Sequence, residues 1–306
     1  MSMLVVLGSV NADHVLQVPH FPRPGETLQG HSYSIIPGGK GANQAVAAAR
    51  MEADIAFIAC VGNDDFGRSM RKAFCGMGMD TDGVLIDDDK PTGIAMIQVS
   101  ATGENSICIS PEANACLTTE RIQPHFAKIR QADTLLMQLE SPIDTVIAAA
   151  KVASEAGTKV LLNPAPAQPL TDDFLALVDI ITPNETEAEV LTGIAVTDDA
   201  TATKAAQALH GKGIDTVLIT LGKQGVWLSE KGNGRRISGF PVTATDTTAA
   251  GDTFNGAFVT ALQEGKSMEE AVRFGNAAAA ISVTRFGAQT SIPSREDVEA
   301  FLSDVE

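Results

Sequence analysis

The sequence is poor in aromatic residues and in positive charge. Aromatic residues make up 5% of its 306 residues, with one Trp and one Tyr, and 22 Lys and Arg stand against 38 Asp and Glu. The resulting net charge of −16 argues against nucleic acid or an anionic membrane as a partner. Long apolar runs are also missing, and none approaches the roughly 20 residues that a membrane-spanning helix needs.

Cysteine is scarce as well, and no two cysteines form a C-x-x-C pair. The four are Cys60, Cys75, Cys108 and Cys116. This usage predicts reduced thiols and a cytoplasmic protein. The first residues, from Met1 to Leu4, lack the basic segment of a signal peptide and lead directly into an apolar run, so we expect no such peptide.

Several motifs of nucleotide-binding and hydrolytic enzymes are absent. Lys40 is followed by Gly41 instead of a hydroxyl residue, so there is no Walker motif G-x-x-x-x-G-K-[ST]. No G-x-G continues to G-x-G-x-x-G, which argues against a nicotinamide-dependent oxidoreductase. There is no G-x-S-x-G or H-E-x-x-H, and the five scattered histidines are more typical of a surface or a lid than of a metal site.

What the chain does have is an alternation of short β-branched runs with longer helical patterns. Strands are predicted at 4–7, 55–61, 134–138, 159–163, 180–182, 216–220 and 226–229. Helices are predicted at 42–51, 66–77, 143–155, 200–211, 253–264 and 268–283. This order predicts an α/β fold in which a mostly parallel, Rossmann-like central sheet carries helices on both faces.

Two stretches interrupt that order with a period of two residues. They cover residues 15–36, and residues 93–99 followed by 105–109. We interpret them as antiparallel strands outside the main sheet. No internal repeat or linker is visible, so a single domain over residues 1–306 is expected.

The most informative motif is the run of small residues at 246–252, D-T-T-A-A-G-D, which leads into a helical pattern. The free N–H groups and positive dipole end of a helix that begins there would make an anion site. Asp252 lies at the mouth of that site. An anion hole with a base beside it is what transfer of a phosphoryl group to a hydroxyl requires, although Asp252 as a plain helix cap is the alternative.

Three further motifs place polar groups where strands end or helices begin. Asn11 and Asp13 follow the apolar strand at 4–8, and ligands of open α/β sheets bind beyond the carboxyl ends of strands. The glycine-rich segment 38–44, G-G-K-G-A-N-Q, opens a helix. Asn184 and Glu187 are three residues apart on one helical face, which suits a hydrated Mg²⁺ ion.

Taken together, these motifs resemble the ribokinase family of carbohydrate kinases, and the resemblance runs along essentially the whole chain. The segments that carry it are 8–13, 38–44, 136–140, 163–166, 181–187, 220–222 and 246–252. It implies ATP-dependent phosphorylation of D-ribose at its 5-hydroxyl. In that reaction Asp252 would take the hydroxyl proton, and the N–H groups of four residues would form the anion hole: Ala249, Ala250, Gly251 and Asp252.

The resemblance also implies the residues that hold each substrate. The sugar hydroxyls would be held, together with Asp252, by Asn11, Asp13, Gly39, Lys40, Gly41, Asn43 and Glu140. ATP would be held by Asn184, Thr220, Leu221, Gly222, Lys223, Gln224, Gly225, Gly251 and Asn276. Asn276 departs from the family, which often has histidine there, so a nucleotide contact at this position is open.

Cations and a partner follow from the same resemblance. Mg²⁺ would be held by Asn184 and Glu187, through water. A K⁺ ion would activate the enzyme from a site made by Asp246, Thr248, Ser282, Arg285, Gly287 and Ser291. Residues 14–36 and 92–110 would form a β lid over the sugar and a surface for a homodimer, because a small one-sided sheet is marginal alone.

Several alternatives remain open from the sequence. Asn11 and Asp13 could be a polar strand-end turn, Lys40 a solvated turn charge, Glu140 a helix cap, and Asp246 a loop cap. The substrate could belong to a sister enzyme, a fructokinase or a deoxyribose or nucleoside kinase. A nucleoside would need an aromatic wall, for which the lid region offers chiefly Phe21 and Tyr33. A silent sugar-binding regulator would not require Asp252.

Overall fold

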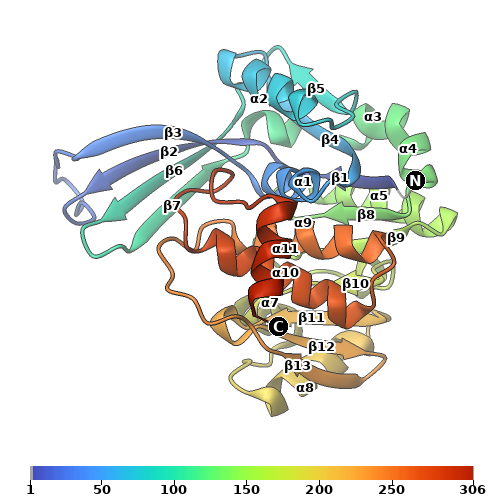
Figure 1. Ribbon diagram of the computed structural model, residues 1–306. Coiled ribbons are helices and arrows are strands. Elements are labelled where there is room, and N and C mark those ends of the chain that lie inside the picture. Colours follow the sequence, from blue (N-terminus) through green and yellow to red (C-terminus); the bar gives the residue numbers. More distant parts are fainter. Residues whose placement is uncertain (1–2, 306) are drawn as a thin grey trace.

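The computed structural model describes residues 3–305, in which two sheets form the frame of the molecule. The larger sheet has nine strands in the order β13-β12-β11-β10-β9-β8-β1-β4-β5, and the smaller has four in the order β3-β2-β6-β7. Figure 1 shows the smaller sheet extending as a wing to one side of the body, away from β13. The large sheet is the α/β body that the sequence predicts.

The central strands are parallel except at one edge. They are β1 (Met3–Leu7), β4 (Asp54–Gly62), β5 (Val84–Asp87), β8 (Thr134–Met137), β9 (Lys159–Leu162), β10 (Ile180–Ile181), β11 (Thr216–Thr220), β12 (Val226–Glu230) and β13 (Asn233–Ile237). Only β12 and β13 pair antiparallel with their neighbours. All seven predicted strands are present. The two that were not predicted, β5 and β13, are short edge strands, and β13 is too polar to show an apolar pattern.

Two apolar cores lie on opposite faces of this sheet. Within β1, Leu4 and Val6 belong to one core, while Val5 and Leu7 belong to the other. Strands buried on both faces read as continuous apolar runs, which is why β1 and β4 were visible in the sequence. Within residues 3–305, no helix combines the length and apolar character required to cross a membrane.

The helices divide between these two faces. One face is covered by α1 (Lys40–Arg50), α2 (Asp65–Gly76), α9 (Ala250–Gln263), α10 (Met268–Ser282) and α11 (Arg295–Asp304). The other is covered by α3 (Thr119–Ile122), α4 (Phe126–Gln131), α5 (Ile143–Ala156), α6 (Asp172–Leu175), α7 (Glu185–Thr192) and α8 (Asp199–His210). Short 3₁₀ turns lie at η1 (Glu112–Cys116), η2 (Gln123–His125) and η3 (Gly222–Gln224).

One predicted helix begins earlier than expected, and one long helix was not predicted. α9 begins at Ala250, three residues before the predicted start, because Ala249 adopts a left-handed conformation (φ 59°) that turns the loop into the helix. Asp252 therefore lies in the first helical turn. α11 was not predicted, although Ser294 and Asp297 form a capping box at its start, which is a recognisable sequence signal.

The wing is a mixed sheet, not a wholly antiparallel one. It consists of β2 (Asn11–Val18), β3 (Ser32–Gly38), β6 (Gly93–Ser100) and β7 (Asn105–Ser110). The outer pairs β2–β3 and β6–β7 are antiparallel hairpins, but the central pair β2–β6 is parallel. The reason is that β2 follows β1 and β6 follows β5, which are parallel strands, so both leave the large sheet in the same direction. This sheet is called the lid below.

Candidate active site

The predicted site residues gather where β1, β8 and β10 end and where α1 and α9 begin. This is the edge of a parallel sheet at which ligands of open α/β folds bind. Asp252 is the central group, and it is 7% exposed. Its carboxylate accepts hydrogen bonds from Asn43 Nδ2 (3.0 Å) and Gln44 Nε2 (2.9 Å), both on α1. Asp252 is therefore not the cap of its own helix; Ala249 occupies that position.

Beside this carboxylate, the first turn of α9 leaves two N–H groups available. Ala250 N–H donates to Thr247 O at 3.3 Å, and Thr253 N–H donates to Ala249 O at 2.8 Å. Ala249 N–H, Gly251 N–H and Asp252 N–H have no hydrogen-bond partner among residues 3–305. Of the four predicted anion-hole residues, Ala250 thus already has a weak partner. Ala249, just before the helix, and Gly251 and Asp252, in its first turn, have N–H groups that are free to donate to an anion.

Asp13 and Asn11 lie at the base of the lid, at the start of β2. Asp13 is 7% exposed, and its Oδ1 has no hydrogen-bond partner in the described part of the chain. A side chain at residue 38 on the neighbouring strand would displace the Asp13 carboxylate, because a Cβ there would lie 2.0 Å from Asp13 Oδ2. Asn11 is held from below by Asn114, whose Nδ2 donates to Asn11 Oδ1 at 2.8 Å. Two polar groups are thus fixed and directed at the same space.

The glycine-rich turn brings Lys40 and Glu140 to the same place. Gly39 has φ 90°, which a side chain would oppose, and a Cβ there would also press on the backbone of β2. Glu140 Oε2 accepts hydrogen bonds from Lys40 N (3.0 Å) and Ser9 Oγ (2.5 Å). Glu140 therefore stabilises the start of α1 and does not cap α5, which begins after Pro142. Gly41 N–H completes the turn by donating to Ser9 Oγ.

These groups form one electrostatic cluster. Burial, together with the negative charges of Glu140 and Asp252, raises the pKa of Asp13 to about 7 against the opposing charge of Lys40. Burial alone would lower the pKa of Lys40, but the carboxylates of Asp252, Glu140, Glu187 and Asp13 outweigh it and raise that pKa above its ordinary value. Lys40 is therefore a permanent cation among four carboxyl groups, not a solvated turn charge.

Asn184 and Glu187 are joined by a capping box at the start of α7. Asn184 Oδ1 accepts from Glu187 N (2.8 Å), and Glu187 Oε2 accepts from Asn184 N (2.9 Å). Asn184 Nδ2 also donates to Glu187 Oε1 (3.0 Å). Burial raises the pKa of Glu187 against the opposing effects of that N–H and Lys40. Both carboxylate oxygens still have a lone pair to accept a hydrogen bond from water, as a hydrated Mg²⁺ ion would require.

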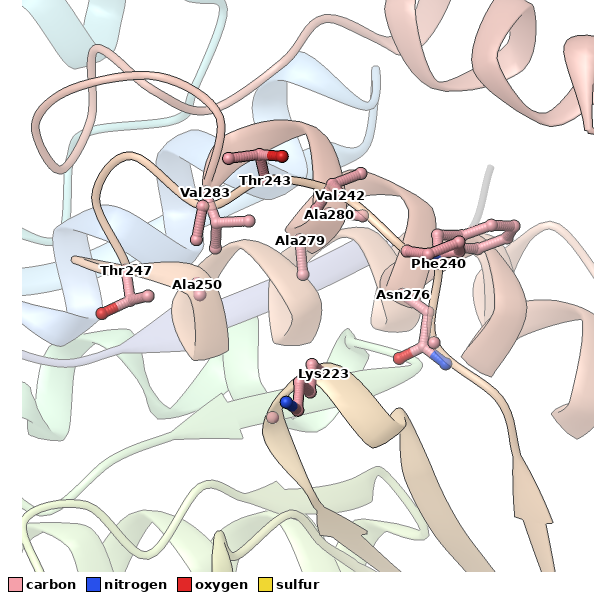
Figure 2. A pocket seen from close by; sticks show the side chains of 14 residues that line it. Lys223, Phe240, Val242, Thr243, Thr247, Ala250, Asn276, Ala279, Ala280 and Val283 are labelled. Atoms are coloured by element: carbon pink, nitrogen blue, oxygen red, sulfur yellow. The ribbon is translucent and has the colours of Figure 1, made fainter.

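A cavity of about 710 Å³ opens beside the first turn of α9. Figure 2 shows Thr247 and Ala250 near one end of it, Phe240 and Asn276 near the other, and Lys223 across from α10. Of the predicted nucleotide residues, Gly222, Lys223 and Asn276 line the cavity; Thr220, Leu221, Gln224, Gly225, Asn184 and Gly251 do not. The sequence interpretation missed the apolar wall: Phe240, Pro241, Val242, Ala279, Ala280 and Val283.

The predicted cation loops are tied together by Asp246. Its Oδ1 accepts from Thr248 N (2.9 Å) and Thr248 Oγ1 (2.7 Å), and its Oδ2 accepts from Gly287 N (2.9 Å). Burial would raise the pKa of Asp246, but these hydrogen bonds lower it below its ordinary value. The Arg285 side chain pairs with Asp297 at 3.1 Å. Because a guanidinium group is positively charged and has no acceptor, Arg285 can offer a cation only its backbone oxygen. Ser282 and Ser291 are fully buried nearby in sequence.

Comparison with known proteins now assigns the family. A model described as pfkB family carbohydrate kinase matches residues 1–295. The chain belongs to this family. It is 58% identical over 299 residues to a ribokinase of Haemophilus influenzae, with 98% of each chain covered. Among solved structures, it resembles Thermotoga maritima ribokinase (TM-score 0.91, 44% identity, 99% of each chain) and Arabidopsis thaliana ribokinase complexed with ribose and ATP (0.93, 35%, 99% of each).

Proposed function

We propose that this protein transfers the γ-phosphoryl group of ATP to the 5-hydroxyl of D-ribose, giving D-ribose 5-phosphate and ADP. The observation that carries the proposal is the position of Asp252. Its buried carboxylate lies beside two free N–H groups, with the Phe240-lined cavity next to the same helical turn and the Asp13 cluster coupled to it by charge. The relatives reported above support ribose as the acceptor and ATP as the donor.

In this mechanism the protein orients two substrates and stabilises charge, as phosphoryl transfer requires. Asp252 accepts the proton of the attacking hydroxyl. Gly251 N–H and Asp252 N–H donate to the oxygens on which negative charge develops. Asn11 and Asp13 bind sugar hydroxyls, and the fixed carboxylate of Asp13 suits a pair of neighbouring hydroxyls. Lys40 balances the negative charge of the cluster before ATP arrives.

Substrate choice is tested by coupled ADP release across a panel of acceptors. The panel contains D-ribose, 2-deoxy-D-ribose, D-fructose, other pentoses and nucleosides. We expect the highest kcat/KM for D-ribose, because a site built to bind hydroxyls rejects analogues that lack one. A higher value for fructose, deoxyribose or a nucleoside would reassign the acceptor within the family. No ADP release with any acceptor would contradict the kinase proposal.

Mg²⁺ accompanies ATP in this proposal, and Asn184 and Glu187 would hold its water shell. The carboxylate of Glu187 and the amide oxygen of Asn184 are hard oxygen ligands of the kind that Mg²⁺ prefers, and Mg²⁺ keeps several waters. The bound ion would neutralise phosphate charge. The described residues contain no cluster of three His, Cys, Asp or Glu side chains that could hold a metal ion.

Binding of D-ribose is expected to tighten as pH rises from about 5.5 to 8. The pKa of Asp13 is raised to about 7 in the free protein, so the group is mostly protonated below that pH. Hydroxyl donors favour the carboxylate form, and binding below pH 7 must therefore release a proton. Calorimetry in buffers of different ionisation enthalpy measures that release. A flat affinity profile, or proton uptake, would contradict the assignment.

Monovalent cations are expected to act on the anion-hole loop. We propose that K⁺ binds between residues 246–248 and 284–291, using Asp246, Thr248, Ser282, Arg285, Gly287 and Ser291. Adding K⁺ to a Na⁺-only buffer at constant ionic strength should raise kcat or ATP affinity, and Asp246→Ala should blunt that response. The matched control is Asp144→Ala, which removes an exposed first-turn carboxylate of α5. Equal rates in both salts would remove the cation from the proposal.

We propose that two copies associate through the lid, in the cytoplasm. The lid exposes large apolar side chains of Tyr33 (57%), Ile35 (48%), Met96 (56%), Ile107 (51%) and Ile109 (48%). The strand registers place Tyr33, Ile35 and Met96 on one face of the lid, and Ile107 and Ile109 on the other face, which is that of Asp13. Exposed apolar side chains gathered on the first of these faces mark an interaction site. Wild-type protein should sediment at twice the chain mass, and Met96→Glu should shift it to the monomer. Val190→Glu, at an exposed apolar position on α7, should leave the dimer intact; a wild-type monomer would contradict the proposal.

A further inference from the structure

A branched chain of buried amide and hydroxyl groups lies directly behind Asp252. It begins with Gln138 Nε2, which donates to Gln44 Oε1 at 2.6 Å. Gln44 Nε2 then donates to both Asp252 Oδ1 and Asn163 Oδ1, each at 2.9 Å. Gln44 is 0% exposed, Gln138 1% and Asn163 7%. Gln138 Oε1 has no hydrogen-bond partner among the described residues, but the three groups of Gln44 that can bond, its oxygen and its two N–H hydrogens, are all used, which defines the arrangement around Gln44.

The orientation of the Gln44 amide is fixed by its partners. Both N–H hydrogens are donated to oxygens that can only accept in this arrangement, and its oxygen receives the Gln138 N–H. Rotating the amide by 180° would direct the oxygen of Gln44 at the carboxylate of Asp252 and at Asn163 Oδ1, and would leave the Gln138 donor facing another donor. Gln44 therefore holds one carboxylate oxygen of Asp252 in one place.

The second branch reaches the anion hole. Asn163 Nδ2 donates to Thr182 O (3.1 Å), and Thr182 Oγ1 donates to Asn255 Oδ1 (2.7 Å). Asn255 Nδ2 donates to Gly251 O (2.9 Å), in the first turn of α9. Thr182 and Asn255 are each 1% exposed. One network thus connects the base, the turn that carries the free N–H groups, and the ends of β8, β9 and β10.

We infer that Gln44 is a positioning residue for phosphoryl transfer: its amide fixes the Asp252 carboxylate relative to the anion-hole turn of α9. Gln44 is too buried to touch either substrate, so it acts through Asp252 and not on the reacting atoms. The sequence interpretation included position 44 in the glycine-rich motif but gave it no role. The inference rests on the proposed function only for its kinetic consequence, because the hydrogen bond itself can be measured without turnover.

The first test observes the Asp252 carboxyl group in the substrate-free protein by ¹³C NMR of labelled carboxyl groups, with Asp252→Asn identifying the signal. Gln44→Met keeps the side-chain length and removes the amide. We expect the chemical shift of the Asp252 carboxyl carbon to change, because the hydrogen bond from Gln44 Nε2 is lost. The other ionisable groups that face Asp252 are Lys40, Asp13 and Glu187, and they are unchanged in this variant. An unshifted signal would overturn the inference whatever the substrate proves to be.

The second test separates positioning from structural support by kinetics. Gln44→Met should lower kcat by about 10–100-fold, leave KM for D-ribose within about threefold, and move the acid limb of the kcat profile to higher pH. Thr158→Val is the matched control, because it removes a buried hydroxyl with two hydrogen bonds at the opposite edge of the sheet. That control should lower the melting temperature without moving the pH limb.

If Gln44→Met does not fold, Gln138→Met provides the test. It leaves Gln44 in place and removes the donor to its amide oxygen, which is one of the three partners that fix its orientation, so kcat should fall about 3–10-fold, with the pH limb moved in the same direction. An unchanged pH limb with a fall in kcat no larger than that of Thr158→Val would show only structural support and overturn the inference. Wild-type protein that phosphorylates no sugar would overturn the proposed function but leave the NMR result decisive for Gln44.

Discussion

Replacing Asp252 with Asn is expected to lower kcat by about 10²–10⁴-fold while leaving D-ribose affinity within a few-fold of wild type. The amide cannot accept the hydroxyl proton, yet it has the same shape and can still receive one hydrogen bond from Asn43 or Gln44. The first turn of α9 therefore keeps its place. Rapid-quench measurement of the chemical step, with calorimetry of ribose binding, separates the two effects.

The matched control for this change is Asp144→Asn. Asp144 is also an acidic residue in the first turn of a helix, α5, but it is exposed and belongs to no part of the site. It should keep wild-type kcat and KM. If Asp252→Asn retained more than half of the wild-type kcat, Asp252 would not be the base, and the two free N–H groups would have to account for the rate alone.

Replacing Asp13 with Asn is expected to act in the opposite way, on binding more than on turnover. The KM for D-ribose should rise by about 10–100-fold, because hydrogen bonds to a charged acceptor contribute about 1.5–3 kcal/mol. The amide also presents N–H groups where the sugar presents hydroxyl donors. The pH dependence of ribose affinity near 7 should disappear with the carboxyl group that causes it.

Gln17→Ala is the control for Asp13. Gln17 lies on the same strand and the same face of the lid, but at its exposed outer end, so the variant tests whether disturbing β2 alone weakens binding. It should bind D-ribose normally. An Asp13→Asn variant with wild-type ribose KM and an unaltered pH profile would exclude Asp13 from the sugar site.

The sequence predicted the central fold well because parallel strands buried on both faces leave an unmistakable apolar signal. β1, β4 and β11 show it clearly, and each was found within one or two residues. The parallel β2–β6 pair could not be predicted in the same way. Period-two alternation shows which side chains share a face, but it carries no information on the direction in which two distant strands pair.

Some residues of the candidate site could also be predicted from the sequence, and others could not. Residues in glycine-rich or strand-end motifs, such as Asp13, Lys40 and Asp252, were predicted, and the structure brings them into one charged cluster. Asn114 and the wall formed by Phe240 and Val242 were not predicted. Asn114 reaches Asn11 across 103 positions of the chain, and an apolar loop that lines a cavity resembles any packed loop. Long-range contacts of this kind depend on the tertiary fold.

Ala249 has a consequence for attempts to stabilise this protein. A left-handed conformation in a residue other than glycine costs roughly 1 kcal/mol or more, so Ala249→Gly would relieve strain in the folded state. The same substitution would widen the range of conformations open to the turn before α9. The direction in which the N–H groups of this turn point would then be less well defined. A β-branched residue at position 249 would destabilise the turn, because such residues disfavour a positive φ. Alanine at this position thus keeps strain in the backbone of the turn that directs the N–H groups of Gly251 and Asp252.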